Sequence, residues 1–182
     1  MSFSIRCFLV LILGFTGCHR DTGVEQQKIE REFETALREH AFERAEKLAQ
    51  RTLELAPEEN RGWDQLIQAQ LGRRDFARAK QTLYAWRRAV VRPSPKLDEY
   101  AGDIARAEKD PALALRSWRA AWQVEPENAR VLEKIARAHD AQRHWDESES
   151  AWSAFLHVQD SATAHVHRAI ARCTCAVALS CR

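Results

Sequence analysis

Residues 41–79 read AFERAEKLAQRTLELAPEENRGWDQLIQAQLGRRDFARA, and this stretch contains one pattern twice. Phe42 is followed three residues later by Ala45, and Phe76 is followed three residues later by Ala79. Each residue of the second pair lies 34 residues after its counterpart in the first. A unit of this length that repeats indicates a helical solenoid, in which each unit is a pair of helices stacked on the next pair.

The same spacing continues through the second half of the chain. The residues that open the second helix of each pair are 34, 35 and 34 positions apart, and a small residue follows each of them by three. These openers and small residues are Phe42 with Ala45, Phe76 with Ala79, Pro111 with Ala114, and Trp145 with Ser148. We therefore predict an all-α solenoid of four antiparallel helix pairs, over residues 26–59, 60–94, 95–128 and 129–160, followed by a C-terminal capping helix over 161–182.

Capping and breaking residues mark the ends of the predicted helices. Asp75, Asp110 and Asn128 are suited to N-cap positions, and Pro111 fits the first turn of a helix. Gly72 is expected to end a helix, because glycine accepts the left-handed conformation common at a helix C-terminus. The predicted helices cover about 24–40, 42–56, 60–72, 75–91, 96–108 and 110–126, with three more that start near 128, 144 and 161.

These repeats resemble the tetratricopeptide repeat (TPR) family, which stacks helix pairs into a right-handed superhelix. The positions that match the family pattern best are Trp63, Leu66, Phe76, Ala79, Leu83, Gly102, Ala105, Ala114, Trp118, Ala121 and Pro126. Phe33 and Ile67 depart from it, because the family prefers Gly or Ala there. The alternative is a generic helix bundle with chance spacing, which three agreeing intervals disfavour.

The N-terminus has the pattern of a targeting segment. Arg6 precedes an apolar run over residues 7–15, which is too short to span a bilayer. Thr16 and Gly17 lead into Cys18, and this arrangement resembles the lipobox of bacterial lipoproteins. The resemblance implies a signal peptide over 1–17, lipidation of Cys18 and a tether over 18–25. The alternative is an ordinary secretory signal with an incidental cysteine.

That resemblance also implies a location. His19 stands where the family uses Asp to retain a lipoprotein in the inner membrane, so the outer membrane, facing the periplasm, is expected. Two or three acyl chains would hold the chain there stably. The net charge of +2 gives no indication of a nucleic-acid partner, and none is expected in that compartment.

In the TPR family the first helix of each pair lines a concave face that grips a peptide or helix of a partner. We expect the polar stripe of these helices to form a charged groove suited to such a segment. Its predicted residues are Arg61, Asp64, Gln68, Lys96, Glu99, Asp103, Arg106, Arg130, Glu133 and Arg137. The alternative is a solvated helix face of the ordinary kind.

A second candidate surface is basic. Residues 72–92 contain seven basic side chains and one acidic one, and they could contact anionic lipid, polysaccharide or an acidic partner. The basic residues are Arg73, Arg74, Arg78, Lys80, Arg87, Arg88 and Arg92. A basic stretch of this kind is also common on a soluble helix face.

Candidates for chemistry are few. The C-terminal segment has His165, His167, Cys173, Cys175 and Cys181, but their spacing matches no metal motif, and no metal or cofactor is predicted. An apolar stripe of Val166, Ile170, Cys173 and Val177 indicates that Cys173 is packed. His139 and His144 flank a turn between helices and are interpreted as packing residues.

The sequence therefore favours a lipid-anchored, periplasm-facing adaptor without catalytic activity. It would bind another protein within an envelope machine, such as one for pilus assembly or outer-membrane barrel assembly. The alternative function is an envelope component that binds anionic lipid or polysaccharide through the Arg-rich helix. The third and weakest alternative is a thiol or metal protein that works through its C-terminal cysteines.

Overall fold

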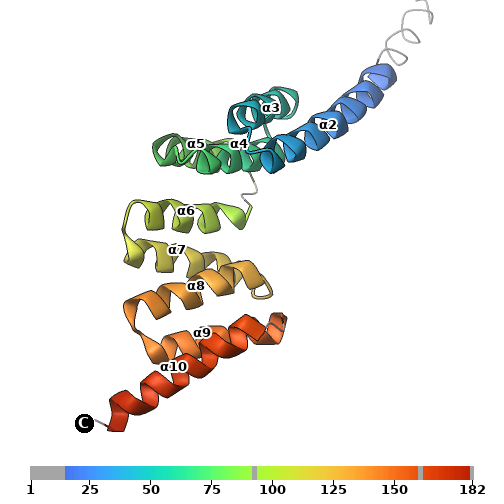
Figure 1. The fold of residues 1–182 in the computed structure, drawn as a ribbon. Coiled ribbons are helices and arrows are strands. Elements are labelled where there is room, and N and C mark those ends of the chain that lie inside the picture. Colours follow the sequence, from blue (N-terminus) through green and yellow to red (C-terminus); the bar gives the residue numbers. More distant parts are fainter. Residues whose placement is uncertain (1–14, 92–93, 160–161, 181–182) are drawn as a thin grey trace, which may run out of the picture. The chain divides into compact units, whose positions relative to one another are not determined.

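The computed structural model describes residues 15–91, 94–159 and 162–180, with side chains described over 23–91, 94–159 and 163–174. All regular secondary structure in these ranges is α-helical (Figure 1). The chain divides into two compact units, residues 1–92 and 93–182. The first contains α2 (Phe15–Arg38), α3 (Phe42–Leu55), α4 (Asn60–Gly72) and α5 (Phe76–Ala89). The second contains α6 (Lys96–Ala107), α7 (Pro111–Val124), α8 (Ala129–Gln142), α9 (Trp145–Val158) and α10 (Ala162–Ser180).

Within each unit, helices that follow one another in the chain pack side by side. In the first unit α2 packs on α3, α3 on α4 and α4 on α5. In the second unit the same order holds from α6 to α10 (Figure 1). The predicted all-α solenoid of helix pairs is confirmed. The right-handed superhelix and its shared concave face stay predictions.

The turn inside each helix pair has the same backbone conformation. His40, Arg74, Lys109 and Arg143 have φ values of 56°, 61°, 64° and 58°, in the left-handed region. They are 34, 35 and 34 residues apart, so the repeat seen in side chains is also a repeat of backbone geometry. In each turn the next residue donates its N–H to a carbonyl five residues earlier, as Asp110 does to Ala105 at 2.9 Å. This is the Schellman arrangement, which satisfies a free carbonyl at the helix end.

Gly72 ends α4 as predicted, but the reason given for it, a left-handed backbone conformation, is wrong. Gly72 is the last residue of α4, but no glycine in the described part of the chain has a positive φ, and Arg74 adopts the left-handed conformation instead. A Cβ atom on Gly72 would lie 2.3 Å from Cε1 of Phe42. Glycine is therefore required at this position to make room for the aromatic ring that opens α3.

The predicted N-caps are confirmed. The carboxylates of Asp75 and Asp110 accept hydrogen bonds from the backbone N–H groups of Arg78 and Leu113, at 3.1 and 2.9 Å. Asn128 accepts one from the N–H of Val131 at 3.2 Å. Such caps satisfy donors that have no partner inside the helix. They explain why α5, α7 and α8 begin within one residue of their predicted starts.

Small residues lie where the helices of a pair approach each other. Ala45, Ala79, Ala114 and Ser148, each three residues after an opener, are all fully buried. In the first unit Ala45 belongs to a core cluster with Phe33, Ala36, Ala49, Leu66 and Ala69. In the second unit two clusters are built around Trp118 and Trp152, and most of their other members are Ala, Leu, Val and Ile. Close packing of this kind fixes how each pair crosses.

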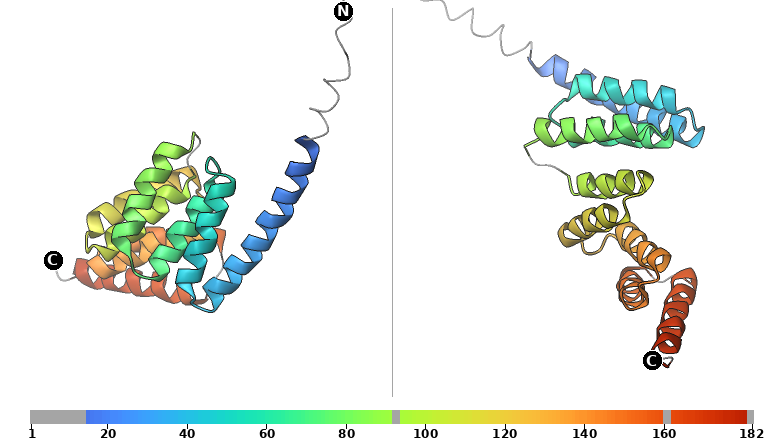
Figure 2. Two further views of the ribbon diagram at one scale, coloured as in Figure 1. Left: turned by 90° about the horizontal axis from the view of Figure 1, so that it is seen from above. Right: turned by 90° about the vertical axis from the view of Figure 1, so that its left-hand side faces the viewer.

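Both ends of the described chain differ from prediction. The helix predicted to begin at Val24 begins at Phe15, so the predicted tether, 18–25, lies within α2. The sequence there contains no Pro, and one Gly does not end a helix. With 24 residues against 14 in α3, the N-terminal part of α2 extends past the other helices of its unit (Figure 2).

The C-terminal helix turns a different face to the core than the sequence predicted. Val166 and Ile170 are 57% and 49% exposed, and Cys173 is exposed, so these three residues of the predicted packed stripe face outward. Among the described side chains of α10, those of Ala164 and Ala171 are buried. The prediction of a packed Cys173 is wrong because contacts with α9 set the orientation of the helix about its axis.

Candidate partner-binding surface

Charged residues link the first helix of one pair to the first helix of the next, at equivalent positions in the two units. In the first unit Arg61 of α4 donates to Glu30 of α2 at 3.3 Å. In the second unit Arg130 of α8 donates to Glu99 of α6 at 2.9 Å. Both pairs are 31 residues apart, so they repeat with the fold. These predicted groove residues therefore contribute to stacking between pairs.

The ion pairs around Glu99 are the most buried part of this surface. The side chain of Glu99 is 2% exposed, and Lys134 Nζ lies 2.6 Å from its Oε1. Lys134 also contacts Oδ2 of Asp103 at 2.6 Å, while Trp118 Nε1 donates to Oδ1 of Asp103 at 3.3 Å. Burial by itself lowers the pKa of Arg130. The negative charge of Glu99 and its hydrogen bond with Arg130 outweigh burial, so the pKa of Arg130 is raised.

This geometry corrects the prediction for Glu99. The Glu99 carboxylate contacts Arg130, another of the predicted groove residues, but it has two cationic partners and almost no exposed surface. A charge this buried must be paired, because an unpaired one costs several kcal/mol. Glu99 is therefore a structural residue and cannot contact a partner. Lys134, which the sequence interpretation missed, is one helical turn after Arg130, and that spacing could have identified it.

The remaining predicted groove residues are spread over both units. Arg137 pairs with Glu133 in its own helix, at 2.7 Å. Arg106, at the end of α6, is exposed, and none of the ion pairs in the described part of the chain involves it. Asp64 and Gln68 are half-buried on α4, and Lys96 is the half-buried first residue of α6.

A cavity of about 260 Å³ lies between α6, α7 and α8 and brings two predicted groove residues together. Its basic lining residues are Arg106, Lys134 and Arg137, and none of the described carboxylates lines it. Its apolar lining is supplied by Trp118 and small residues, namely Pro111, Ala114, Ala138 and Ala141. An apolar wall with cations around it is the complement of an apolar side chain flanked by carboxylates.

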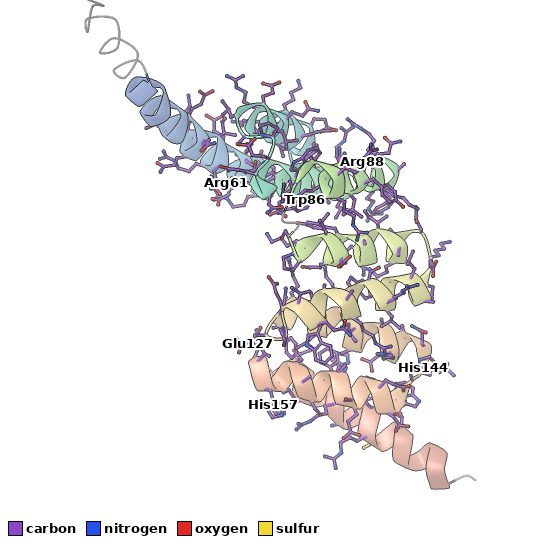
Figure 3. All side chains as sticks on the ribbon, turned by 180° about the vertical axis from the view of Figure 1, so that it is seen from behind. Arg61, Trp86, Arg88, Glu127, His144 and His157 are labelled. Atoms are coloured by element: carbon purple, nitrogen blue, oxygen red, sulfur yellow. The ribbon has the colours of Figure 1, made fainter. Side chains whose placement is uncertain are left out.

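The predicted basic surface is partly neutralised. Arg73 and Arg78 both contact the carboxylate of Glu46, each at 2.7 Å, and the Glu46 side chain is 7% exposed. Two of the seven predicted residues therefore hold the first unit together. Arg74, Arg87 and Arg88 are exposed, and Figure 3 marks Arg88 on α5. Lys80 is half-buried, and Arg92 lies outside the described residues.

Among the described side chains, no three His, Cys, Asp or Glu residues come together as metal ligands would. The side chains of Cys18, Cys175 and Cys181 are not among those described. His167 stacks on Trp152, with ring centroids 4.8 Å apart, and lies 3.4 Å from Oδ2 of Asp140.

Over the part of the chain that the structure describes, none of the helices combines the length and apolar character needed to span a bilayer.

Solved structures share this fold. MamA superposes with a TM-score of 0.63 at 13% sequence identity, over 82% of this chain and 81% of that one. YrrB, described as a TPR protein with an unusual peptide-binding site, gives 0.58 at 16% identity, over 78% and 73%. The complex of Naa15 and Naa10 bound to HypK gives 0.62 at 16% identity, over 81% of this chain and 22% of that one.

No family model and no curated protein matches the sequence. At these identities the structural likeness establishes the fold, an all-α helical solenoid of the TPR kind, and nothing beyond it.

Proposed function

We propose that this chain is a non-enzymatic adaptor that binds a segment of another protein at the cavity between α6, α7 and α8. The observation that carries the proposal is the cavity itself, with an apolar wall, three basic residues and none of the described carboxylates. YrrB, whose fold is similar, is described as having a peptide-binding site, which supports a peptide as the ligand here. The proposed partner segment carries an apolar side chain with acidic residues on either side.

The three basic residues at the cavity have different roles: Lys134 is structural, whereas Arg106 and Arg137 are proposed to bind the partner. Lys134 is held between Glu99 and Asp103, so its charge is already balanced. None of the described carboxylates forms an ion pair with Arg106, and Arg137 is 57% exposed beside a half-exposed Glu133. Arg106 and Arg137 are therefore the residues that would contact the carboxylates of the partner. A planar guanidinium can bind a carboxylate through two parallel hydrogen bonds, which adds specificity as well as affinity.

The proposal includes the location expected from the sequence. Lipidation of Cys18 would hold the chain on the periplasmic face of the outer membrane, and α2 would connect the anchor to the first unit. The support is the sequence pattern around Cys18. In such a place an adaptor would join components of an envelope machine, for example one that assembles pili or outer-membrane barrels.

Capture from detergent-solubilised envelopes of the native cells tests the binding site. The bait is the full chain, and the double variant Arg106→Glu, Arg137→Glu should lose at least about nine-tenths of the captured partner, because reversed charges repel its carboxylates. Arg116→Glu is the matched control, since Arg116 is exposed on α7 and does not line this cavity. Equal capture by the double variant and the control would rule out this site.

Fractionation of cells tests the anchor. Cys18→Ala should move the protein from the membrane fraction to the soluble fraction, since one or no acyl chain does not give stable attachment. If the variant stays on membranes, the lipid anchor is wrong. Binding of Cys18→Ala to anionic vesicles, lost on adding Arg87→Glu and Arg88→Glu, would then favour the alternative of a lipid-binding basic helix.

A further inference from the structure

A second, larger hollow lies in the same unit, between α7 and α9, and α8 forms its floor. A cavity of about 420 Å³ is lined there by Leu132, Ile135 and His139, three residues at helical spacing on one face of α8. A neighbouring cavity has a volume of about 640 Å³. Three residues line both cavities, namely Arg119 of α7, His139 of α8 and Glu147 of α9. Neither of the residues proposed above to bind the partner, Arg106 and Arg137, lines this hollow.

The buried polar residue in this hollow is His139, which is 4% exposed. Nη2 of Arg119 lies 3.1 Å from its Nε2. A guanidinium can only donate, so Nε2 accepts, and the imidazole proton of the neutral ring is on Nδ1. That Nδ1–H is buried and has no hydrogen-bond partner among the described residues. Buried donors are rarely left unpaired, because the missing bond is costly, and this one is therefore a place to look for a ligand acceptor.

Arg119 adds a second donor beside His139. It is exposed, and none of the ion pairs in the described ranges involves it, so no carboxylate among the described residues pairs with its charge. Its remaining N–H groups can bind an anion at the cavity. Burial and the charge of Arg119 both lower the pKa of His139, which keeps the ring in the neutral form described above.

The rest of the cavity has two kinds of lining. Trp122, Leu132, Ile135, Ala151 and Ala154 form an apolar slot. Nε1 of Trp122 donates to the carbonyl of Pro126 at 3.1 Å, so the ring is fixed in place and its polar group is already satisfied.

Acceptors lie on the α9 side of the cavity, where its lining includes Asp146, Glu147 and Ser150. A ligand that fits would therefore have an apolar body, an anionic group near α7 and N–H donors near α9. A peptide segment has all three, whereas a fatty acid has no N–H donor.

We propose that this hollow is a second binding site, for a peptide segment that presents a carboxylate beside an apolar side chain. The apolar side chain lies between Trp122 and Ile135, and the carboxylate accepts from Arg119 and from Nδ1 of His139. Backbone N–H groups of the segment donate to Glu147. Glu127, just before α8, and His144, just after it, lie on opposite sides of this unit (Figure 3), so the floor of the site runs along the helix between them.

The probe for this site is N-acetyl-L-phenylalanine, compared with its C-terminal amide and with octanoate. In the full-length protein in detergent, the indole N–H resonance of Trp122, assigned with Trp122→Phe, reports occupancy. A ligand of this size is expected to bind with a dissociation constant of about 1 mM. The amide should bind at least about tenfold more weakly, because it lacks the charge-assisted bonds to Arg119.

Variants then locate the contact. Arg119→Gln should weaken binding of the acid to the level of the amide. Lys109→Gln, which removes a positive charge from the exposed turn between α6 and α7 outside both cavities, should leave the affinity for the acid unchanged. Equal binding of acid and amide in the wild type would overturn the proposal without any variant. Octanoate binding as tightly as the acid would show a fatty-acid site instead, and the absence of any shift of Trp122 would show no site.

Discussion

A Cβ atom on Gly102 would lie 2.4 Å from Cδ1 of Trp118, so the indole of α7 rests directly on the backbone of α6. Trp118 is 1% exposed, and its Nε1 donates to Asp103, the residue after this glycine. The contact therefore fixes both the distance between the two helices and the position of an acidic side chain that Lys134 also contacts. Gly102 therefore links the packing of α6 against α7 to the ion pairs that join this helix pair to the following one.

The first prediction concerns Gly102→Ala. The added methyl group has no room, and the free energy of unfolding should fall by about 1–3 kcal/mol in chemical denaturation, the range for overpacked cores. Gly23→Ala is the control, because a Cβ there meets no atom within 4 Å. The control should be neutral or gain up to about 1 kcal/mol, as expected for replacing a helical glycine. A stable Gly102→Ala variant would show that the indole can move away.

The second prediction concerns the left-handed turns. Lys109 has a φ of 64°, a conformation that costs a residue with a side chain roughly 1 kcal/mol and glycine almost nothing. Lys109→Gly should therefore raise the free energy of unfolding by about 0.5–1 kcal/mol. Arg116→Gly, in the exposed middle of α7, should lower it by about 1 kcal/mol. If both variants lose stability equally, the turn conformation is not the one described.

The third prediction concerns Lys134→Met. It leaves the buried Glu99 carboxylate with Arg130 alone, and we expect a loss of about 3 kcal/mol, near the lower end for breaking a buried pair. The double variant Glu99→Met, Lys134→Met should lose less than Lys134→Met alone, since the buried Glu99 charge is removed together with its partner, while Asp103 loses Lys134 in both variants. Arg137→Met, which breaks an exposed pair four residues apart, should lose no more than about 0.5 kcal/mol.

The fourth prediction is a dependence of stability on pH. Burial, and then the charge of Arg119, lower the pKa of His139 below the ordinary 6.5; His144 acts in the same direction, whereas Glu147 and Asp140 oppose it. Between the lowered pKa and 6.5 the unfolded chain binds more protons than the folded one, so stability falls as the pH falls through that window. The slope attributable to His139 is at most about 1.4 kcal/mol per pH unit.

His139→Gln is the variant that tests this dependence, because Gln can accept from Arg119 but does not titrate. Urea denaturation from pH 7.5 to 5.0 should give a flatter profile for the variant than for the wild type. Parallel profiles would mean that His139 titrates with the same pKa in the folded and unfolded states.

The repeat architecture could be predicted from the sequence because its causes are local. The caps at Asp75, Asp110 and Asn128 depend on residues within a few positions of each other, and the burial of Ala45 or Ala114 follows from its place relative to the opener of its helix. Such features repeat every 34 or 35 residues, so one unit gives information about the others. The candidate binding site could not be predicted in the same way, because it depends on contacts between different repeats.

Which charges are available to a partner was decided only by the tertiary structure. Glu99 and Arg106 belong to the same predicted stripe, yet Lys134 and Arg130 from the next helix pair bury and neutralise Glu99, while Arg106 stays exposed. The meeting of Arg119 with His139 likewise joins residues from different helices. The sequence was sufficient to predict where α3 to α9 start, end and pair, to within about two residues, since these features depend on short-range bonds. Burial of a charge depends on neighbours supplied by another repeat, and only the packed structure brings those neighbours together.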